Sequence, residues 1–217
     1  MVFDLDGTLI HSVPDLTACL NLLLAEEGGR SLEDGEVRLM VGDGVDNLIQ
    51  RGFAAGGSRP VSGDEVTALV ARFLRAYEAT PALRTHCYPG AAATLAALRT
   101  EGCVLGLCTN KPHRATVEVL ELLGLAEFFS GVVAAESTAF IKPDPRPLLA
   151  ALDAMGAARE RAVMVGDSPV DVAVARNAGI PVIAVSYGYT RVPPRDLGAD
   201  ILIDSLTELP AALARLP

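Results

Sequence analysis

Short apolar runs that end abruptly in polar or glycine residues recur along the chain. The clear runs occupy residues 2–3, 103–108, 162–165, 181–185 and 201–203, and a weaker one occupies residues 131–134. They are rich in Val and Ile and carry apolar side chains at successive positions. This pattern is typical of strands that are buried on both faces of a sheet.

Segments with helical spacing of apolar residues lie between these runs. They span residues 91–100, 112–123, 145–155 and 170–178. Pro112 and Pro145 stand where a helix tolerates proline, at its first turn, and a glycine follows each segment as a stop signal. Strands that alternate with helices predict βαβ units, so we expect an α/β fold with a Rossmann-like parallel sheet.

Residues 13–85 show a different pattern, with helical periodicity and no convincing strand. The helical stretches are residues 14–27, 31–40, 45–55 and 63–80, and residues 56–60 are typical of a loop between helices. We therefore expect a core domain formed by residues 1–12 and 86–217, with an α-helical domain of residues 13–85 inserted after the first strand.

Length and charge exclude several classes of protein. The chain has 217 residues, half of them hydrophobic, which fits one domain with a smaller insert and argues against disorder. Its net charge of −9 disfavours binding to nucleic acid or to an anionic membrane. The four cysteines form no CxxC pair, and two acids within the first six residues argue against a signal peptide. We expect free thiols and a cytoplasmic protein. The sequence does not predict the oligomeric state.

Polar side chains follow the strands at the points where ligands bind in parallel sheets. They are Asp4, Asp6, Thr109, Asn110, Lys142, Asp167 and Asp171. Neighbouring carboxylates repel one another unless a cation joins them, and hard oxygen ligands favour Mg²⁺. The hydroxyl, amide and ammonium groups of Thr109, Asn110 and Lys142 suit the oxygens of a phosphate group.

The segment Asp4-Leu5-Asp6-Gly7-Thr8 carries the most specific chemistry. A carboxylate such as Asp4 can attack phosphorus, and a second one, Asp6, can protonate the leaving oxygen and later activate water. Gly7 allows the turn that points both acids at one place. The alternative is a plain turn capped by Thr8, but an acidic pair directly after a buried strand is costly without a functional partner.

The other candidates have structural alternatives as well. Thr109 and Asn110 could cap the following helix, and Lys142 could be a solvated loop residue. Asp167 could be a helix N-cap, and Asp171 could merely stabilise the positive end of a helix dipole. We favour the phosphate and metal roles because all these residues follow predicted strands of one sheet.

In this order, the motifs resemble those of the haloacid dehalogenase superfamily. The first motif is Asp4 to Thr8, the second is Thr109, the third is Lys142, and the fourth is Gly166-Asp167-Ser168-Pro169-Val170-Asp171. The resemblance implies a Rossmann-like core with an inserted helical cap. It also implies Mg²⁺ held by Asp4, the backbone carbonyl of Asp6, and Asp167. Gly7, Thr8, Gly166, Ser168 and Asp171 would have supporting roles.

Within this superfamily, the resemblance extends to phosphoglycolate phosphatases. It rests on the opening Asp4–Leu9 with residues 12–16, on Thr109-Asn110-Lys111-Pro112, and on Gly42-Asp43-Gly44, which is similar to a cap loop that faces the substrate. It implies a phosphatase that acts on a small phosphorylated metabolite, 2-phosphoglycolate first. A sugar-phosphate phosphatase or phosphomutase is the alternative, and a non-catalytic receiver or binding domain is a distant one.

Overall fold

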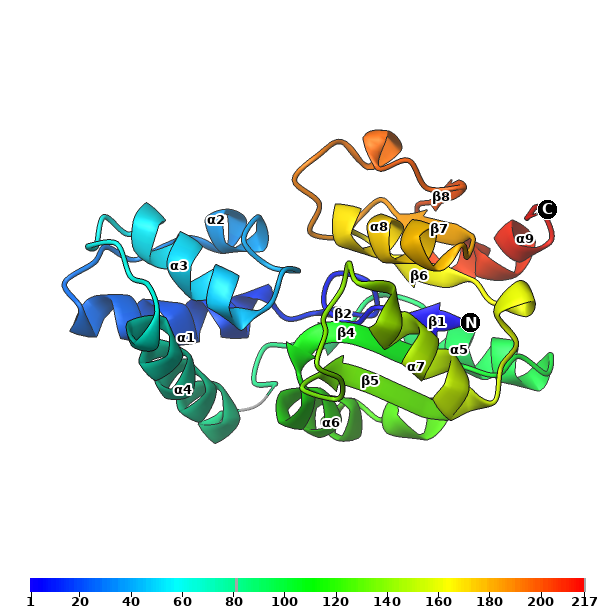
Figure 1. The fold of residues 1–217 in the computed structure, drawn as a ribbon, viewed down its shortest axis with the longest axis horizontal. Coiled ribbons are helices and arrows are strands. Elements are labelled where there is room, and N and C mark those ends of the chain that lie inside the picture. Colours follow the sequence, from blue (N-terminus) through cyan, green and yellow to red (C-terminus); the bar gives the residue numbers. More distant parts are fainter. Residues whose placement is uncertain (81, 217) are drawn as a thin grey trace.

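A six-stranded parallel sheet forms the centre of the molecule, as the apolar runs predict. The computed structural model describes residues 1–80 and 82–216. The strands follow the order β5-β4-β1-β6-β7-β8, and each neighbouring pair is parallel (Figure 1). Their bounds are Val2–Phe3 (β1), Gly106–Pro112 (β4), Gly131–Ala135 (β5), Met164–Gly166 (β6), Val182–Val185 (β7) and Ile201–Ile203 (β8).

Helices cover both faces of this sheet, which explains why the strands are apolar at successive positions. Because side chains alternate along a strand, Val2 and Phe3 belong to two different apolar clusters. Helices α7 and α8 pack on the Val2 face, and α5, α6 and α9 supply side chains to the Phe3 face. The helices span Ala91–Thr100 (α5), His113–Leu122 (α6), Pro145–Met155 (α7), Pro169–Ala178 (α8) and Leu209–Leu213 (α9). The predicted α/β fold class is confirmed.

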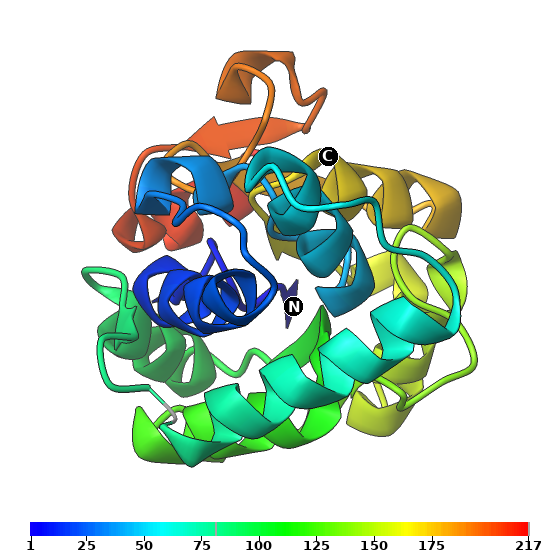
Figure 2. The ribbon, with the colours of Figure 1, turned by 90° about the vertical axis from the view of Figure 1, so that its left-hand side faces the viewer.

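Four helices of the insert form a separate bundle at one end of the molecule (Figure 1). They are α1 (Val13–Glu26), α2 (Asp34–Arg38), α3 (Val45–Ala55) and α4 (Asp64–Ala79). Leu20, Ile49, Phe53, Leu69 and Phe73 belong to an apolar cluster of their own. Seen from this end, the bundle lies in front of the core (Figure 2). We call α1–α4 the cap; the domain boundaries at 12/13 and 85/86 stay a prediction.

The structure corrects the predicted elements in several places. The strand expected over residues 103–108 begins at Gly106 and continues to Pro112. The helix expected over residues 31–40 is only Asp34–Arg38, because Glu33 and Glu36 form a capping box that fixes its start. Pro112 ends β4 with extended backbone, and α6 begins one residue later. A two-stranded antiparallel sheet of β2 (Ile10–His11) and β3 (His86–Cys87) was not expected. It links the two chain segments that connect the core with the cap.

The structure also bears on membrane crossing and on the state of the cysteines. Within the described part of the chain, none of the helices combines the length and the apolar character that a bilayer crossing requires. All four cysteines, at positions 19, 87, 103 and 108, are free thiols.

Candidate active site

The register of the sheet brings the first and fourth motifs together. Strand β1 lies between β4 and β6, and Phe3 pairs with Leu107 on one side and Val165 on the other. The N–H of Asp4 donates to the carbonyl of Val165 at 2.9 Å. Asp4 and Asp167 therefore leave neighbouring strands at the same edge, where the strand order reverses and ligands of such sheets bind.

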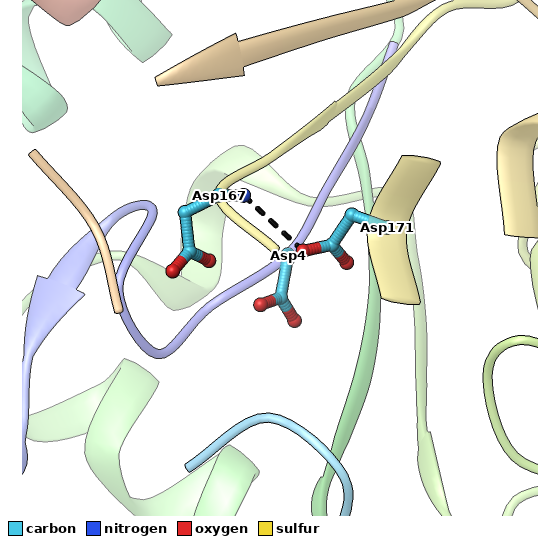
Figure 3. Close-up of side chains that lie close together, drawn as sticks. All are labelled: Asp4, Asp167 and Asp171. Atoms are coloured by element: carbon cyan, nitrogen blue, oxygen red, sulfur yellow. Dashed lines mark hydrogen bonds between the residues drawn. The ribbon is translucent and has the colours of Figure 1, made fainter. Parts of the chain in front are cut away.

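Three buried carboxylates meet at this edge. Asp4, Asp167 and Asp171 each place a carboxylate oxygen within 4.8 Å of the others (Figure 3). The ammonium of Lys142 lies 2.8 Å from Asp4 Oδ1 and 2.7 Å from Asp171 Oδ1. One ammonium against three carboxylates leaves two negative charges in a buried place. Such a charge is costly without a counterion.

The protonation of these groups reflects that cost. Burial raises the pKa of Asp4, Lys142 opposes this shift and the nearby Asp171 adds to it, so that the resulting pKa is about 6. Burial and the charges of Asp171 and Asp4 hold the pKa of Asp167 well above its usual range. Burial disfavours the charged form of Lys142, but Asp171 and Asp4 outweigh it and raise its pKa. Lys142 is therefore a permanent cation in this cluster.

The fourth motif holds its two acids in different ways. Asp167 accepts hydrogen bonds from the hydroxyl of Thr8 at 3.1 Å and from the N–H of Tyr189 at 2.5 Å. Asp171 Oδ2 accepts from the hydroxyl and the N–H of Ser168, which form a capping box at the start of α8. Because Lys142 takes its other oxygen, Asp171 is anchored on both sides, which is the geometry of a supporting residue.

Glycines allow the backbone to approach these acids closely. Gly7 adopts φ +89°, and a Cβ at this position would lie 2.8 Å from Asp167 Cγ. A Cβ at Gly166 would lie 2.7 Å from Asp171 Oδ2. Side chains do not tolerate such distances, so both glycines are required by the packing around the carboxylates.

We expect Gly7→Ala to lower the free energy of unfolding by more than the strained backbone conformation of alanine alone would lower it. The left-handed conformation costs roughly 1–2 kcal/mol for alanine, and the methyl group would also displace Asp167. Gly28→Ala is the matched control, since Gly28 has φ +74° and open space around its Cβ position. Urea unfolding and turnover should show a larger loss of stability for Gly7→Ala and a loss of activity in that variant alone. Equal effects of the two substitutions would contradict the crowding argument.

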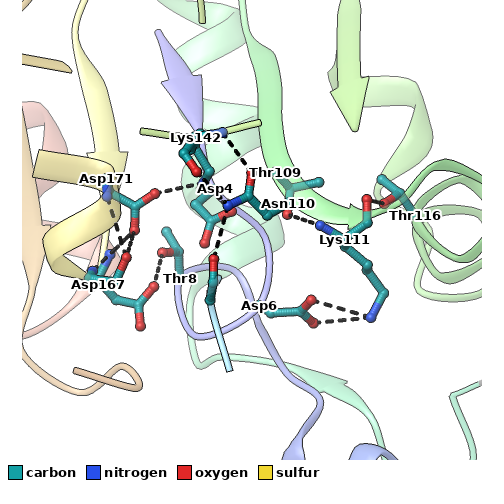
Figure 4. A network of polar contacts seen from close by, with 12 residues as sticks. Asp4, Asp6, Thr8, Thr109, Asn110, Lys111, Thr116, Lys142, Asp167 and Asp171 are labelled. Atoms are coloured by element: carbon teal, nitrogen blue, oxygen red, sulfur yellow. Dashed lines mark hydrogen bonds and ion pairs between the residues drawn. The ribbon is translucent and has the colours of Figure 1, made fainter. Parts of the chain in front are cut away.

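Asp6 lies apart from the carboxylate cluster, although it is only two residues from Asp4 (Figure 4). Its Oδ1 accepts a 2.5 Å hydrogen bond from the hydroxyl of Ser12, and both its oxygens lie 3.3 Å from the ammonium of Lys111. The sequence singled out neither partner for a role. Lys111 directly follows the candidate residues Thr109 and Asn110 in the sequence. This neighbourhood was the feature of the sequence that could have indicated a role for Lys111.

The second motif contributes side chains at the end of β4. Thr109 is buried beside the cavity, and its hydroxyl accepts from the N–H of Lys111 at 3.3 Å. The Asn110 amide is engaged elsewhere: it donates to the carbonyls of Gly42 and Lys142 and accepts from the N–H of Lys142. The Asn110 side chain thus connects Gly42 of the cap loop with Lys142 of the core, and its contact with phosphate stays a prediction.

The cap loop divides into two parts. Gly42 and Gly44 line the cavity between cap and core, as expected for a loop that faces the substrate. Asp43 was expected to share that role, but its carboxylate turns away to Arg51 and Arg191. These guanidinium groups outweigh the effect of burial and lower the pKa of Asp43. Arg191 belongs to the core, so Asp43 ties the cap to it through an ion pair.

The donor set of the carboxylate cluster fits a small divalent cation. Mg²⁺ binds oxygen ligands, mostly one or two carboxylates completed by water and substrate phosphate. Asp4 and Asp167 offer such oxygens within 4.8 Å of each other, and two uncompensated negative charges match the charge of the ion.

Comparisons with known proteins identify the family to which the chain is similar. The family model described as haloacid dehalogenase-like hydrolase matches residues 1–185. The phosphoglycolate phosphatase of Rhodospirillum rubrum is 47% identical over 212 residues, which cover 96% of this chain and 88% of that protein. The phosphoglycolate phosphatase of Caulobacter vibrioides is 43% identical and covers 100% of this chain and 91% of its own length.

Solved structures share the whole fold. The crystal structure of a predicted phosphoglycolate phosphatase from Haemophilus somnus superimposes with a TM-score of 0.90 at 29% identity, covering 97% of this chain and 96% of that one. CbbY from Rhodobacter sphaeroides, solved in complex with phosphate, gives a TM-score of 0.80 at 26% identity, covering 96% and 94%. The chain therefore belongs to the haloacid dehalogenase-like hydrolases, as a phosphoglycolate phosphatase-like phosphoric monoester hydrolase.

Proposed function

We propose that the protein is a Mg²⁺-dependent phosphatase that hydrolyses 2-phosphoglycolate through an aspartyl-phosphate intermediate. The observation that carries the chemistry is the position of Asp4, which lines the cavity, pairs with Lys142 and lies within 4.8 Å of Asp167. The choice of substrate is supported by the relatives named phosphoglycolate phosphatase, which match at 43–47% identity over nearly the whole chain.

In the first step, a carboxylate oxygen of Asp4 attacks phosphorus and the bond to the ester oxygen breaks. Asp6 lines the same cavity and gives its proton to the leaving glycolate oxygen. In the second step, water attacks the phosphorus of the aspartyl phosphate, Asp6 takes the proton, and phosphate leaves with Asp4 restored.

The surrounding residues lower the cost of both steps. Lys142 and the hydroxyl of Thr109 stabilise the negative charge of the phosphoryl oxygens. Asp4, the carbonyl of Asp6, and Asp167 would hold Mg²⁺, which neutralises charge between the nucleophile and the phosphoryl group when bound. The cap covers the cavity and excludes water during the first step. Free cysteines suit the reducing cytoplasm, where we place the enzyme.

A substrate panel tests this proposal. With saturating Mg²⁺, kcat/KM for 2-phosphoglycolate should exceed that for glucose 6-phosphate by at least about 100-fold, because a site that binds one polar group discriminates strongly against a substrate without it. Pyrophosphate and xylulose 1,5-bisphosphate complete the panel; the second is the compound bound to a CbbY variant of 25% identity. A higher kcat/KM for any of these compounds would reject 2-phosphoglycolate. Isomerisation without release of phosphate would identify a mutase instead.

A further inference from the structure

The cavity above Asp4 has one polar end and apolar walls. Leu16, Leu48, Phe73 and Leu74 of the cap form part of the walls, while Asp4, Asp6 and Lys111 lie at the polar end. An organic group that enters here leaves water, so any charge it carries requires a partner on the protein. The charges at the polar end therefore determine which phosphate esters bind well.

Lys111 is the one cationic side chain among the described residues that line this cavity. It is only 6% exposed. Its ammonium lies 3.0 Å from the hydroxyl oxygen of Tyr77 and 4.6 Å from the centre of the Tyr77 ring. The ammonium also lies beside the Asp6 carboxyl group, so Lys111 places a positive charge at the polar end of the cavity.

Two of the three hydrogen bonds that the Lys111 ammonium donates are long. It carries three donors, of which Tyr77 accepts one. Both Asp6 oxygens lie at 3.3 Å, longer than the 2.7–2.9 Å of a strong charge-assisted hydrogen bond. Among the described residues no further group accepts from it. A ligand carboxylate could replace one of the long contacts with Asp6, and the hydroxyl proton of Tyr77 could be donated to the same carboxylate.

We infer that Lys111 and Tyr77 bind the carboxylate of the substrate and so select phosphate esters of short 2-hydroxy acids. This inference rests on the proposed function and identifies the residues that would give it specificity. Asp4 repels a carboxylate near the nucleophile, whereas Lys111 attracts it, and the apolar walls strengthen the ion pair with Lys111. Tyr77 belongs to α4 of the cap and Lys111 to β4 of the core, so the carboxylate also joins the two.

The test compares 2-phosphoglycolate with ethyl phosphate, which lacks the carboxylate. The measured quantity is the ratio of their kcat/KM values in wild type, Lys111→Met, Tyr77→Phe and Arg72→Met. The ratio cancels any effect on Asp6 that both esters share. We expect the ratio to fall about 100-fold in Lys111→Met and about 10-fold in Tyr77→Phe. Arg72 pairs with Glu26 and Glu27 on the cap surface, so Arg72→Met should keep the wild-type ratio.

The results distinguish a Lys111 that binds the substrate carboxylate from a Lys111 that only positions Asp6. If both esters lose activity by the same factor in Lys111→Met and Tyr77→Phe, Lys111 only positions Asp6 and the inference is overturned. If Lys111→Met does not fold, Tyr77→Phe decides by the same criterion, since it keeps the ring that stacks on Phe73. A wild-type enzyme that does not prefer 2-phosphoglycolate to ethyl phosphate would reject the proposed function itself, which is a separate result.

Discussion

Asp4→Asn should lower turnover of 2-phosphoglycolate by at least about 10⁴-fold, the order of loss seen when a nucleophile is removed. An amide oxygen is a poor nucleophile toward phosphorus, and Asp6, the other acid among the described residues that line the cavity, is held apart by Ser12 and Lys111. The fold should survive, because Lys142 keeps its 2.7 Å contact with Asp171 and the substitution removes one of three crowded negative charges. Phosphate release and circular dichroism measure the two effects.

Two further measurements make this prediction specific. Borohydride reduction of wild type quenched during turnover should convert the acyl phosphate at Asp4 into homoserine, which peptide mapping detects. Asp153→Asn is a control for the loss of a carboxylate, since Asp153 lies exposed on α7. Mass spectrometry must show that the introduced asparagine has not deamidated to aspartate. Turnover within tenfold of wild type by an intact Asp4→Asn protein would reject Asp4 as the nucleophile.

The sequence was most informative where one local pattern decides the structure. Helices 91–100 and 145–155 were predicted with the bounds that α5 and α7 have, because a glycine at each C-terminal end and helical apolar spacing act within a few residues. The strands were recognisable because burial on both faces leaves little choice of side chain. Their register then brings Asp4 and Asp167 to one edge of the sheet, and Lys142 reaches Asp4 there from the loop that follows β5.

Local sequence patterns do not predict contacts between residues that lie far apart in the chain. The N–H of Ser12 donates to the hydroxyl of Tyr189 across 177 positions, and Asp15 accepts from the N–H groups of Arg84 and Thr85. Strands β2 and β3 have two residues each, too few for a periodic signal, and form because the connections between core and cap run side by side. The partners of Asp6 and Asp43 depend on the same long-range packing.

Removal of Mg²⁺ should abolish turnover and also change how stability depends on pH. The folded-state pKa is about 6 for Asp4 and well above the usual value for Asp167. The folded protein therefore binds these protons more tightly than the unfolded chain. The stabilising contribution is full below about pH 4, decreases as pH rises toward 6 and beyond, and is lost when both acids are ionised. Asp4 and Asp167 thus destabilise the metal-free protein at neutral pH.

In the proposed function Mg²⁺ binds the ionised carboxylates, so we expect it to reverse this loss of stability in the pH range where the loss occurs. At a concentration about 100 times its dissociation constant, a ligand stabilises a protein by about 2.7 kcal/mol, which raises the melting temperature of a chain of this size by several degrees. Differential scanning fluorimetry should show this shift at pH 7.5 and a much smaller one at pH 5. Asp167→Asn should lose the shift, while Asp153→Asn should keep it. Full activity in excess EDTA, or an equal shift in Asp167→Asn, would show that the carboxylate cluster does not hold the metal.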